Sequence, residues 1–198
     1  MIEALDFIGL AVFAISGALA AAEKRLDILG FVLFATITGV GGGTLRDLLL
    51  DTEIFWIESQ GAIWVCIGSA VATWFFAPKL QSLRVLLLWM DAMGLAVFAV
   101  VGTQKALAFD VPIVVAIGMG MMTASFGSLI RDTLLNRPVV LLGPDIYVTA
   151  ALLGAASFVV FDAVGAGQDL ALWVSVFSAF TLRAAAIRFR LRLPKYGH

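Results

Sequence analysis

Long apolar runs, separated by short polar segments, occupy almost the whole chain. Seven of these runs approach the length of about 20 helical residues that crosses roughly 30 Å of hydrocarbon. The segments between them are too short to hold a soluble domain. The pattern therefore predicts seven membrane-spanning helices, at residues 5–22, 28–50, 60–77, 85–106, 112–135, 145–162 and 170–189.

The first part of the chain recurs further along. Residues 5–57 match residues 90–142 without a gap, and 16 of the 53 positions are identical. Two stretches carry most of the match: LDFIGLAVFAISG against MDAMGLAVFAVVG, and GGGTLRDLLL against FGSLIRDTLL. Internal similarity of this kind indicates a duplicated structural unit.

Each copy holds three predicted spans, and an odd number of spans places the second copy upside down relative to the first. We therefore expect an all-α membrane protein with a single domain over residues 1–198. It contains two inverted three-helix repeats, at 5–77 and 90–162, and a seventh helix at 170–190. Proteins built in this way commonly carry a substrate or ion path where the repeats meet.

The composition agrees with lipid as the solvent. Hydrophobic residues make up 62% of the chain and charged residues 14%, and the mean hydropathy is +1.03. Soluble domains are about half apolar and about a quarter charged. The net charge of −1 gives no reason to expect a nucleic-acid partner, and we expect none. Membrane lipid is the expected surrounding partner.

The basic residues predict the orientation, because Lys and Arg accumulate in cytoplasmic segments. With seven spans, 11 of the 13 Lys and Arg residues fall on the face that holds the C-terminus. We expect this face in the cytoplasm and the N-terminus outside. The residues on it are Lys24, Arg25, Lys79, Arg84, Arg131, Arg137, Arg183, Arg188, Arg190, Arg192 and Lys195.

Two of the predicted spans are rich in glycine near their middle. Because each glycine weakens a helix by about 1 kcal/mol relative to alanine, we expect both spans to break there. A break frees backbone carbonyls, which can replace the water shell of a monovalent cation. The residues expected to line such a pore are Thr38, Gly41, Gly42, Gly43, Thr44, Arg46, Thr123, Ser125, Gly127, Ser128 and Arg131. The alternative is that the glycines serve close helix packing.

An Arg–Asp dipeptide follows the glycines in each copy, as Arg46–Asp47 and Arg131–Asp132. Charged residues cost about 2.5–3.5 kcal/mol each at the membrane centre, so they need partners. We expect structural ion pairs involving Asp6, Asp47, Asp91 and Asp132, with Asp6 near Arg46 and Asp91 near Arg131. A second interpretation, which stays open, places both arginines along a pathway as a gate or a barrier to cations. Lys105 ends its span and is expected to extend to the membrane surface.

We expect neither enzymatic activity nor a bound cofactor. GVGGGT lacks the Gly-Lys-Ser/Thr ending of a P-loop and does not satisfy GxGxxG. A single cysteine, Cys66, and a single histidine, His198, form no metal-ligating set. The expected non-protein components are a permeating potassium ion and bound lipid.

The paired segments GVGGGTLRD and ASFGSLIRD, within a duplicated three-span unit followed by a seventh span, resemble the trimeric intracellular cation (TRIC) channel family. The likeness covers essentially the whole chain and is closest to the short prokaryotic members. It implies a homotrimer in the inner membrane of a prokaryotic cell, with a potassium-permeable pore inside each protomer. By this resemblance, Gly41, Gly42, Gly43 and Arg46 belong to one half of the pore, and Gly127, Ser128 and Arg131 to the other.

Three functions compete. The leading hypothesis is a passive monovalent-cation channel. The alternative is a secondary transporter for a small zwitterion such as glycine, because inverted repeats with broken helices suit alternating access equally well. A transporter is expected to carry a coupling carboxylate at the midplane, and none occurs away from the Arg–Asp pairs, which favours the channel. A non-transporting scaffold requires the glycines to serve packing alone.

Overall fold

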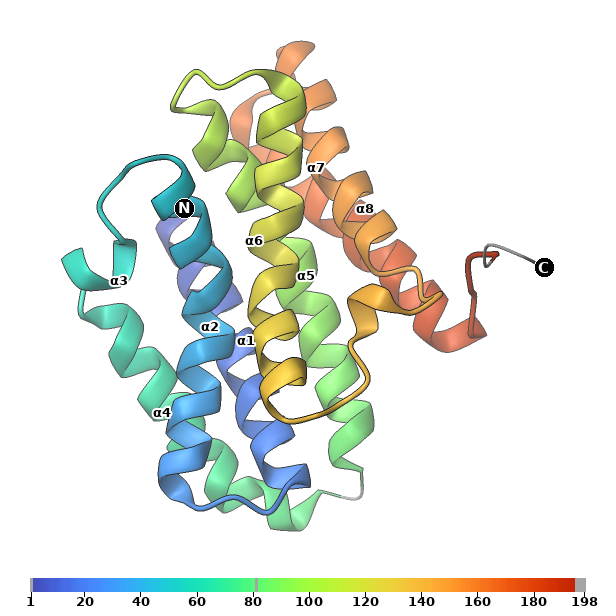
Figure 1. Ribbon diagram of the computed structural model, residues 1–198. Helices are drawn as coiled ribbons and strands as arrows, with labels where there is room; N and C mark the ends of the chain where they lie inside the picture. The colour runs from blue at the N-terminus through green and yellow to red at the C-terminus, as the bar shows by residue number, and fades with distance from the viewer. Residues whose placement is uncertain (1, 81, 195–198) are drawn as a thin grey trace.

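The computed structural model describes residues 2–80 and 82–194, and helices dominate it (Figure 1). A short helix, α3 (Phe55–Glu58), and two 3-10 turns, η1 (Ala77–Lys79) and η2 (Val140–Leu142), lie between the long helices. The long helices are α1 (Ile2–Glu23), α2 (Ile28–Leu49), α4 (Gly61–Phe76), α5 (Leu83–Leu107), α6 (Ile113–Leu134), α7 (Val148–Ala163) and α8 (Gln168–Phe189).

These seven helices coincide, to within a few residues at each end, with the seven runs predicted from the sequence. Among the described residues, six are long and apolar enough to cross a membrane. The exception is α7, which is apolar but has only 16 residues, or about 24 Å at 1.5 Å per residue. The all-helical membrane fold is therefore confirmed, and α3 is an addition that hydropathy did not predict.

Helices α1 and α5 form the centre of the bundle. Helix α1 packs against α2, α4 and α5, and helix α5 packs against α1, α6, α7 and α8. Helices α2 and α6 run side by side across one face, with α4 on one flank and α7 and α8 on the other (Figure 1). The helices of the two copies thus meet along α1–α5 and along α2–α6.

The α1–α5 contact centres on two phenylalanines. The rings of Phe13 and Phe98 stack with their centroids 5.4 Å apart, and these residues occupy equivalent positions in the two copies. A Cβ atom on Gly94 would lie 2.3 Å from the Phe13 ring, so only glycine leaves room for it. A Cβ atom on Gly9, the equivalent of Gly94, would lie 3.3 Å from the ring of Phe98.

The predicted break at the glycines of α2 and α6 is wrong. Both helices are continuous, from Ile28 to Leu49 and from Ile113 to Leu134. In a continuous helix the carbonyls near the glycines accept bonds from amides four residues later, so they are not free to hold a cation. The glycines instead allow the two helices to touch, and backbone contact across the crossing compensates for their low helix propensity.

The C-terminal segment folds back over the loop between α6 and α7. The Leu193 amide donates to the Pro144 carbonyl at 2.7 Å, and Arg192 forms an antiparallel bridge with Asp145. This contact begins directly after Arg190, which ends α8 in the left-handed conformation with φ 53°. Lys195, on the basic face predicted from the sequence, and His198 lie outside the described residues.

Candidate functional site

The two copies meet most closely where α2 crosses α6. A Cβ atom on Gly42 would lie 1.9 Å from the Thr123 carbonyl oxygen, and one on Gly127 would lie 2.2 Å from the Thr38 carbonyl oxygen. These two contacts are reciprocal, because Thr38 and Gly42 correspond to Thr123 and Gly127 in the other copy. The crossing therefore requires glycine at both positions, with the helix backbones in direct contact.

The threonine hydroxyls expected to line a pore bond to their own helices. Thr38 Oγ1 donates to the Phe34 carbonyl at 2.6 Å, and Thr123 Oγ1 donates to the Met119 carbonyl at 2.7 Å. Both side chains are buried. Likewise, Ser125 Oγ donates to the Met121 carbonyl at 2.7 Å. The crossing is thus a closed, packed region in this structure.

Two further predicted residues of α2, Gly43 and Thr44, face the short helix α3. Gly43 packs under Phe55, whose ring would lie 2.6 Å from a Cβ atom at that position. Thr44 Oγ1 accepts a hydrogen bond from Trp56 Nε1 at 2.8 Å. Gly41 lies beside Gly127, with 3.4 Å between its ideal Cβ and the Gly127 Cα. Helix α3 thus covers one end of the crossing.

An ion network around Asp47, here called the Asp47 network, lies at this end. Asp47 Oδ1 accepts from Arg46 Nε at 2.9 Å and lies 3.2 Å from Lys105 Nζ. Asp47 Oδ2 accepts from the Phe55 amide at 3.1 Å. The Asp47 carboxylate is fully buried, whereas the Lys105 side chain is 32% exposed. The network joins α2 of the first copy to α5 of the second.

A second network surrounds Arg131, the largest fully buried side chain among the described residues, and is here called the Arg131 network. Arg131 NH1 donates to Asp91 Oδ1 at 2.9 Å, so the structure brings together the pair expected from the sequence. Its Nε and NH2 donate to the two carboxylate oxygens of Asp132 at 2.8 and 3.0 Å. NH1 also donates to Ser16 Oγ, a residue of the first copy.

The Arg131 network extends to the end of α1. Arg137 Nε lies 3.4 Å from Asp132 Oδ1, and Arg137 NH1 donates to Glu23 Oε2. This ion pair again joins the second copy to the first. At each end of the α2–α6 crossing, ion pairs therefore join side chains of one copy to side chains of the other.

Two residues beside the Arg131 network were not predicted as site residues from the sequence. Tyr147 is fully buried and its hydroxyl lies 2.8 Å from Ser128 Oγ, which itself donates to the Ser125 carbonyl at 2.9 Å. Arg183 lies over the Tyr147 ring, with its Cζ 5.0 Å from the centroid, and donates to the Ile146 carbonyl at 3.1 Å. A charged residue inside the predicted span at 170–189 was the signal for Arg183. Nothing in the sequence marked Tyr147.

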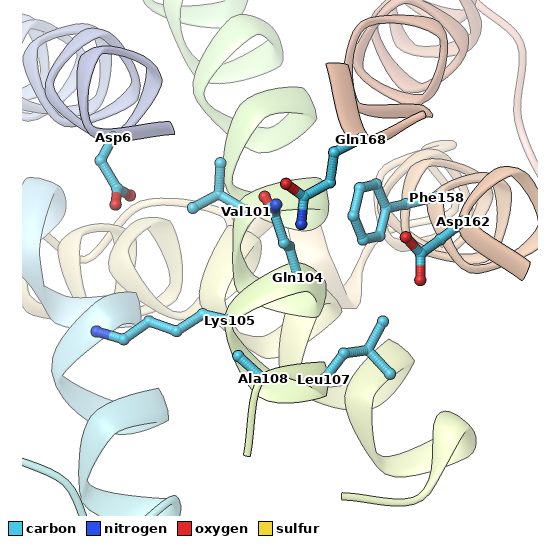
Figure 2. A pocket seen from close by; sticks show the side chains of 9 residues that line it. All are labelled: Asp6, Val101, Gln104, Lys105, Leu107, Ala108, Phe158, Asp162 and Gln168. Atoms are coloured by element: carbon cyan, nitrogen blue, oxygen red, sulfur yellow. The ribbon is translucent and has the colours of Figure 1, made fainter. Parts of the chain in front are cut away.

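Two cavities approach these networks from opposite ends of α5. A basic cavity of about 860 Å³ reaches Arg131 and Asp132 and opens among the ends of α1, α6 and α8. Seven of its lining residues are cationic and three are anionic. A small cavity of about 410 Å³, drawn in Figure 2, reaches Lys105 and is also lined by Asp6, Gln104, Asp162 and Gln168. No cluster of metal-ligating side chains occurs in the described part of the chain.

Lys105 lies differently from the expectation drawn from the sequence. Lys105 was expected to extend to the membrane surface, but its ammonium turns to α2 because the buried Asp47 carboxylate attracts it. Asp6 lies in the wall of the small cavity. Arg46 forms an ion pair with its neighbour Asp47, with 2.9 Å between Arg46 NH2 and Asp47 Oδ1.

Comparisons with known proteins agree on the family. The family model described as "Glycine transporter" matches twice, at residues 3–78 and 88–163. A UPF0126 membrane protein of Vibrio cholerae is 36% identical over 98% of this chain and 82% of its own length. The UPF0126 inner membrane protein YadS of Escherichia coli is 34% identical over 98% of this chain and 95% of its own length.

A solved structure matches over nearly the whole fold. The TRIC trimeric intracellular cation channel orthologue from Rhodobacter sphaeroides is 49% identical, with a TM-score of 0.93. The match covers 96% of this chain and 98% of that one. The chain is therefore a membrane protein of the TRIC channel family, to which the UPF0126 membrane proteins are related and whose family model is described as "Glycine transporter".

Proposed function

We propose that this chain is a passive channel for monovalent cations, with potassium as the permeating ion. The observation that carries the proposal is the full-length likeness to a cation channel structure, at 49% identity and a TM-score of 0.93. Conduction through such a protein involves no enzymatic step, and it requires no resident cofactor.

The proposed pathway runs inside one protomer between the two copies. It begins in the basic cavity, passes the Arg131 network and the α2–α6 crossing, and leaves by the Asp47 network and the small cavity. In this structure the path is closed, because Arg131 is fully buried among its partners and the glycines of the crossing are in contact. Opening requires the ion pairs to separate and α2 to move away from α6.

Under this proposal the residues that were expected to line the pore still act in conduction, but not by offering free backbone carbonyls. Thr38, Gly42, Thr123 and Gly127 form the part that moves, since backbone contact at the crossing excludes an ion there. Arg46 and Arg131 lie at its two ends and repel cations until their carboxylate partners are shared with the ion. The helices supply no free carbonyls, so selectivity depends on side chains and water.

The assembly and orientation belong to the same proposal. The related structure is described as trimeric, and we infer that this chain also forms a homotrimer in the inner membrane. The two copies are proposed to be inverted, with the basic cavity in the cytoplasm, as expected from the excess of Lys and Arg on that side.

A second candidate rests on the description of the family model. Its name, "Glycine transporter", favours a carrier for a small zwitterion. The closed crossing between two cavities on opposite sides is also compatible with alternating access. The two candidates differ in turnover, because a channel passes discrete currents and a carrier shows saturable uptake.

Recording from the purified protein in planar bilayers under a potassium gradient tests the proposal. Discrete steps that reverse near the potassium equilibrium potential are the expected result. Silent bilayers, together with saturable glycine uptake by liposomes from the same preparation, would replace the channel by the carrier. If neither current nor uptake is observed, the non-transporting scaffold is the function that remains.

A further inference from the structure

We propose that the small cavity is a binding site for a monovalent cation, and that the ammonium group of Lys105 occupies the innermost cation position of this site in the present structure. The Asp47 carboxylate is the ligand at that position. The physiological meaning of the site rests on the proposed channel function, but cation binding itself does not.

The wall of the small cavity is suited to a cation. Asp6 and Asp162 contribute carboxylates, Gln104 and Gln168 contribute amides, and Lys105 is the one cationic residue among the described residues that line it. These oxygen-bearing side chains come from four helices, and Gln104 and Gln168 lie together between Asp6 and Asp162 in Figure 2. Carboxylate and amide oxygens are ligands for hard cations.

One of these oxygens lacks a hydrogen bond. Gln104 Oε1 is buried and has no hydrogen-bond partner within the described residues. Buried acceptors are nearly always satisfied, so an unsatisfied one calls for a bound ion or water. Gln104 precedes Lys105 in the last turns of α5, where the helix carbonyls also favour positive charge.

Lys105 lies between the cavity and the buried carboxylate of Asp47. Its ammonium lies 3.2 Å from Asp47 Oδ1, and its side chain is 32% exposed. In Figure 2 it extends from α5 towards α2 and away from the other lining residues. An ammonium group carries the same charge as a potassium ion and is of similar size. Lys105 therefore stands where an incoming cation would meet Asp47.

The lysine is not repeated in the other copy. The equivalent residue of the first copy is Ala20, and Asp132, the equivalent of Asp47, is bound by Arg131 and Arg137. Asp47 already accepts from Arg46 and from the Phe55 amide. The Lys105 ammonium is the exposed member of its pair with Asp47, so a free cation that enters the cavity can take its place at the buried carboxylate.

The test compares the wild type with Lys105→Gln in detergent. The melting temperature is followed as potassium chloride replaces N-methyl-D-glucamine chloride at constant ionic strength. Removing the tethered charge should lower the half-saturating potassium concentration by roughly tenfold, the low end of the effect of a local charge on counter-ion concentration. Lys105→Arg keeps the charge and should behave as the wild type.

Two controls make the result specific. Lys79→Gln removes an exposed lysine outside the cavity and should leave the titration unchanged. Asp162→Asn removes a carboxylate of the cavity and should weaken binding in the Lys105→Gln background. The inference is overturned if Lys105→Gln titrates as the wild type does, or if Lys79→Gln gains affinity equally.

Bilayer recordings separate this inference from the channel proposal. If the wild type conducts, Lys105→Gln should raise the unitary current at low potassium, and an unchanged current contradicts the inference while the channel stands. If the wild type is silent, the channel proposal fails. The melting titration then decides the cation site by itself.

Discussion

Phe13 and Phe98 occupy the same position in the two copies of the repeat, and their rings stack on each other at 5.4 Å with an interplanar angle of 29°. The duplicated sequence thus contributes both halves of one contact. The same holds at the α2–α6 crossing, where Gly42 touches Thr123 and Gly127 touches Thr38. The interface between the copies is therefore built from reciprocal pairs.

Replacement of Phe98 by alanine should destabilise the protein by about 3–5 kcal/mol, because the ring is almost fully buried against Phe13. A double-mutant cycle with Phe13→Ala should show a coupling of about 0.5–1.5 kcal/mol for the aromatic pair. Unfolding in detergent measures both. Phe75→Ala removes a ring that is 66% exposed and should leave the free energy of unfolding nearly unchanged.

Alanine at Gly127 should weaken the α2–α6 crossing. The added Cβ would lie 2.2 Å from the Thr38 carbonyl oxygen, and backbone cannot move aside as a flexible side chain can. Overpacking of this kind costs about 1–3 kcal/mol. The matched control is Gly118→Ala on the same helix, where nothing lies within 4 Å. It should stabilise the helix by up to about 1 kcal/mol, and equal melting temperatures for the two variants would refute the crossing.

Removal of the Asp91 charge should have a large effect on stability. Asp91→Asn leaves Arg131 with less compensation at a fully buried position, and breaking such a pair costs about 3–5 kcal/mol. The double variant Asp91→Asn/Arg131→Met removes both charges and should recover part of the loss. A double variant less stable than Asp91→Asn would show that Arg131 has other, stronger partners.

Neutralising the basic cavity should increase cation current under the channel proposal. Arg84 lines this cavity and is exposed. Arg84→Gln should therefore raise the local cation concentration and the current at low salt. The gain should fall as salt approaches about 0.15 M, where screening acts within about 8 Å. Lys79→Gln, nearby in the chain but outside the cavity, is the control, and an equal gain for both variants contradicts the assignment.

The sequence alone determined the helices, the duplication and the location of the buried charges. Apolar runs of about 20 residues specify spans because lipid leaves the backbone no partner outside its own helix. That rule is local, so no knowledge of neighbouring helices is needed. The Asp91–Arg131 pair could be predicted for a related reason, since a charge inside a span requires a partner nearby.

Only the tertiary structure decided what the glycines do and where Lys105 points. A run such as Gly41–Gly43 both weakens a helix and permits close approach, and the sequence contains no information on which effect prevails. The answer lies in another helix, at the carbonyl of Thr123. Likewise, Lys105 turns inward because Asp47, 58 positions earlier in the chain, is buried within 3.2 Å of its ammonium group. Such outcomes depend on contacts between distant segments, which hydropathy and local propensity do not encode.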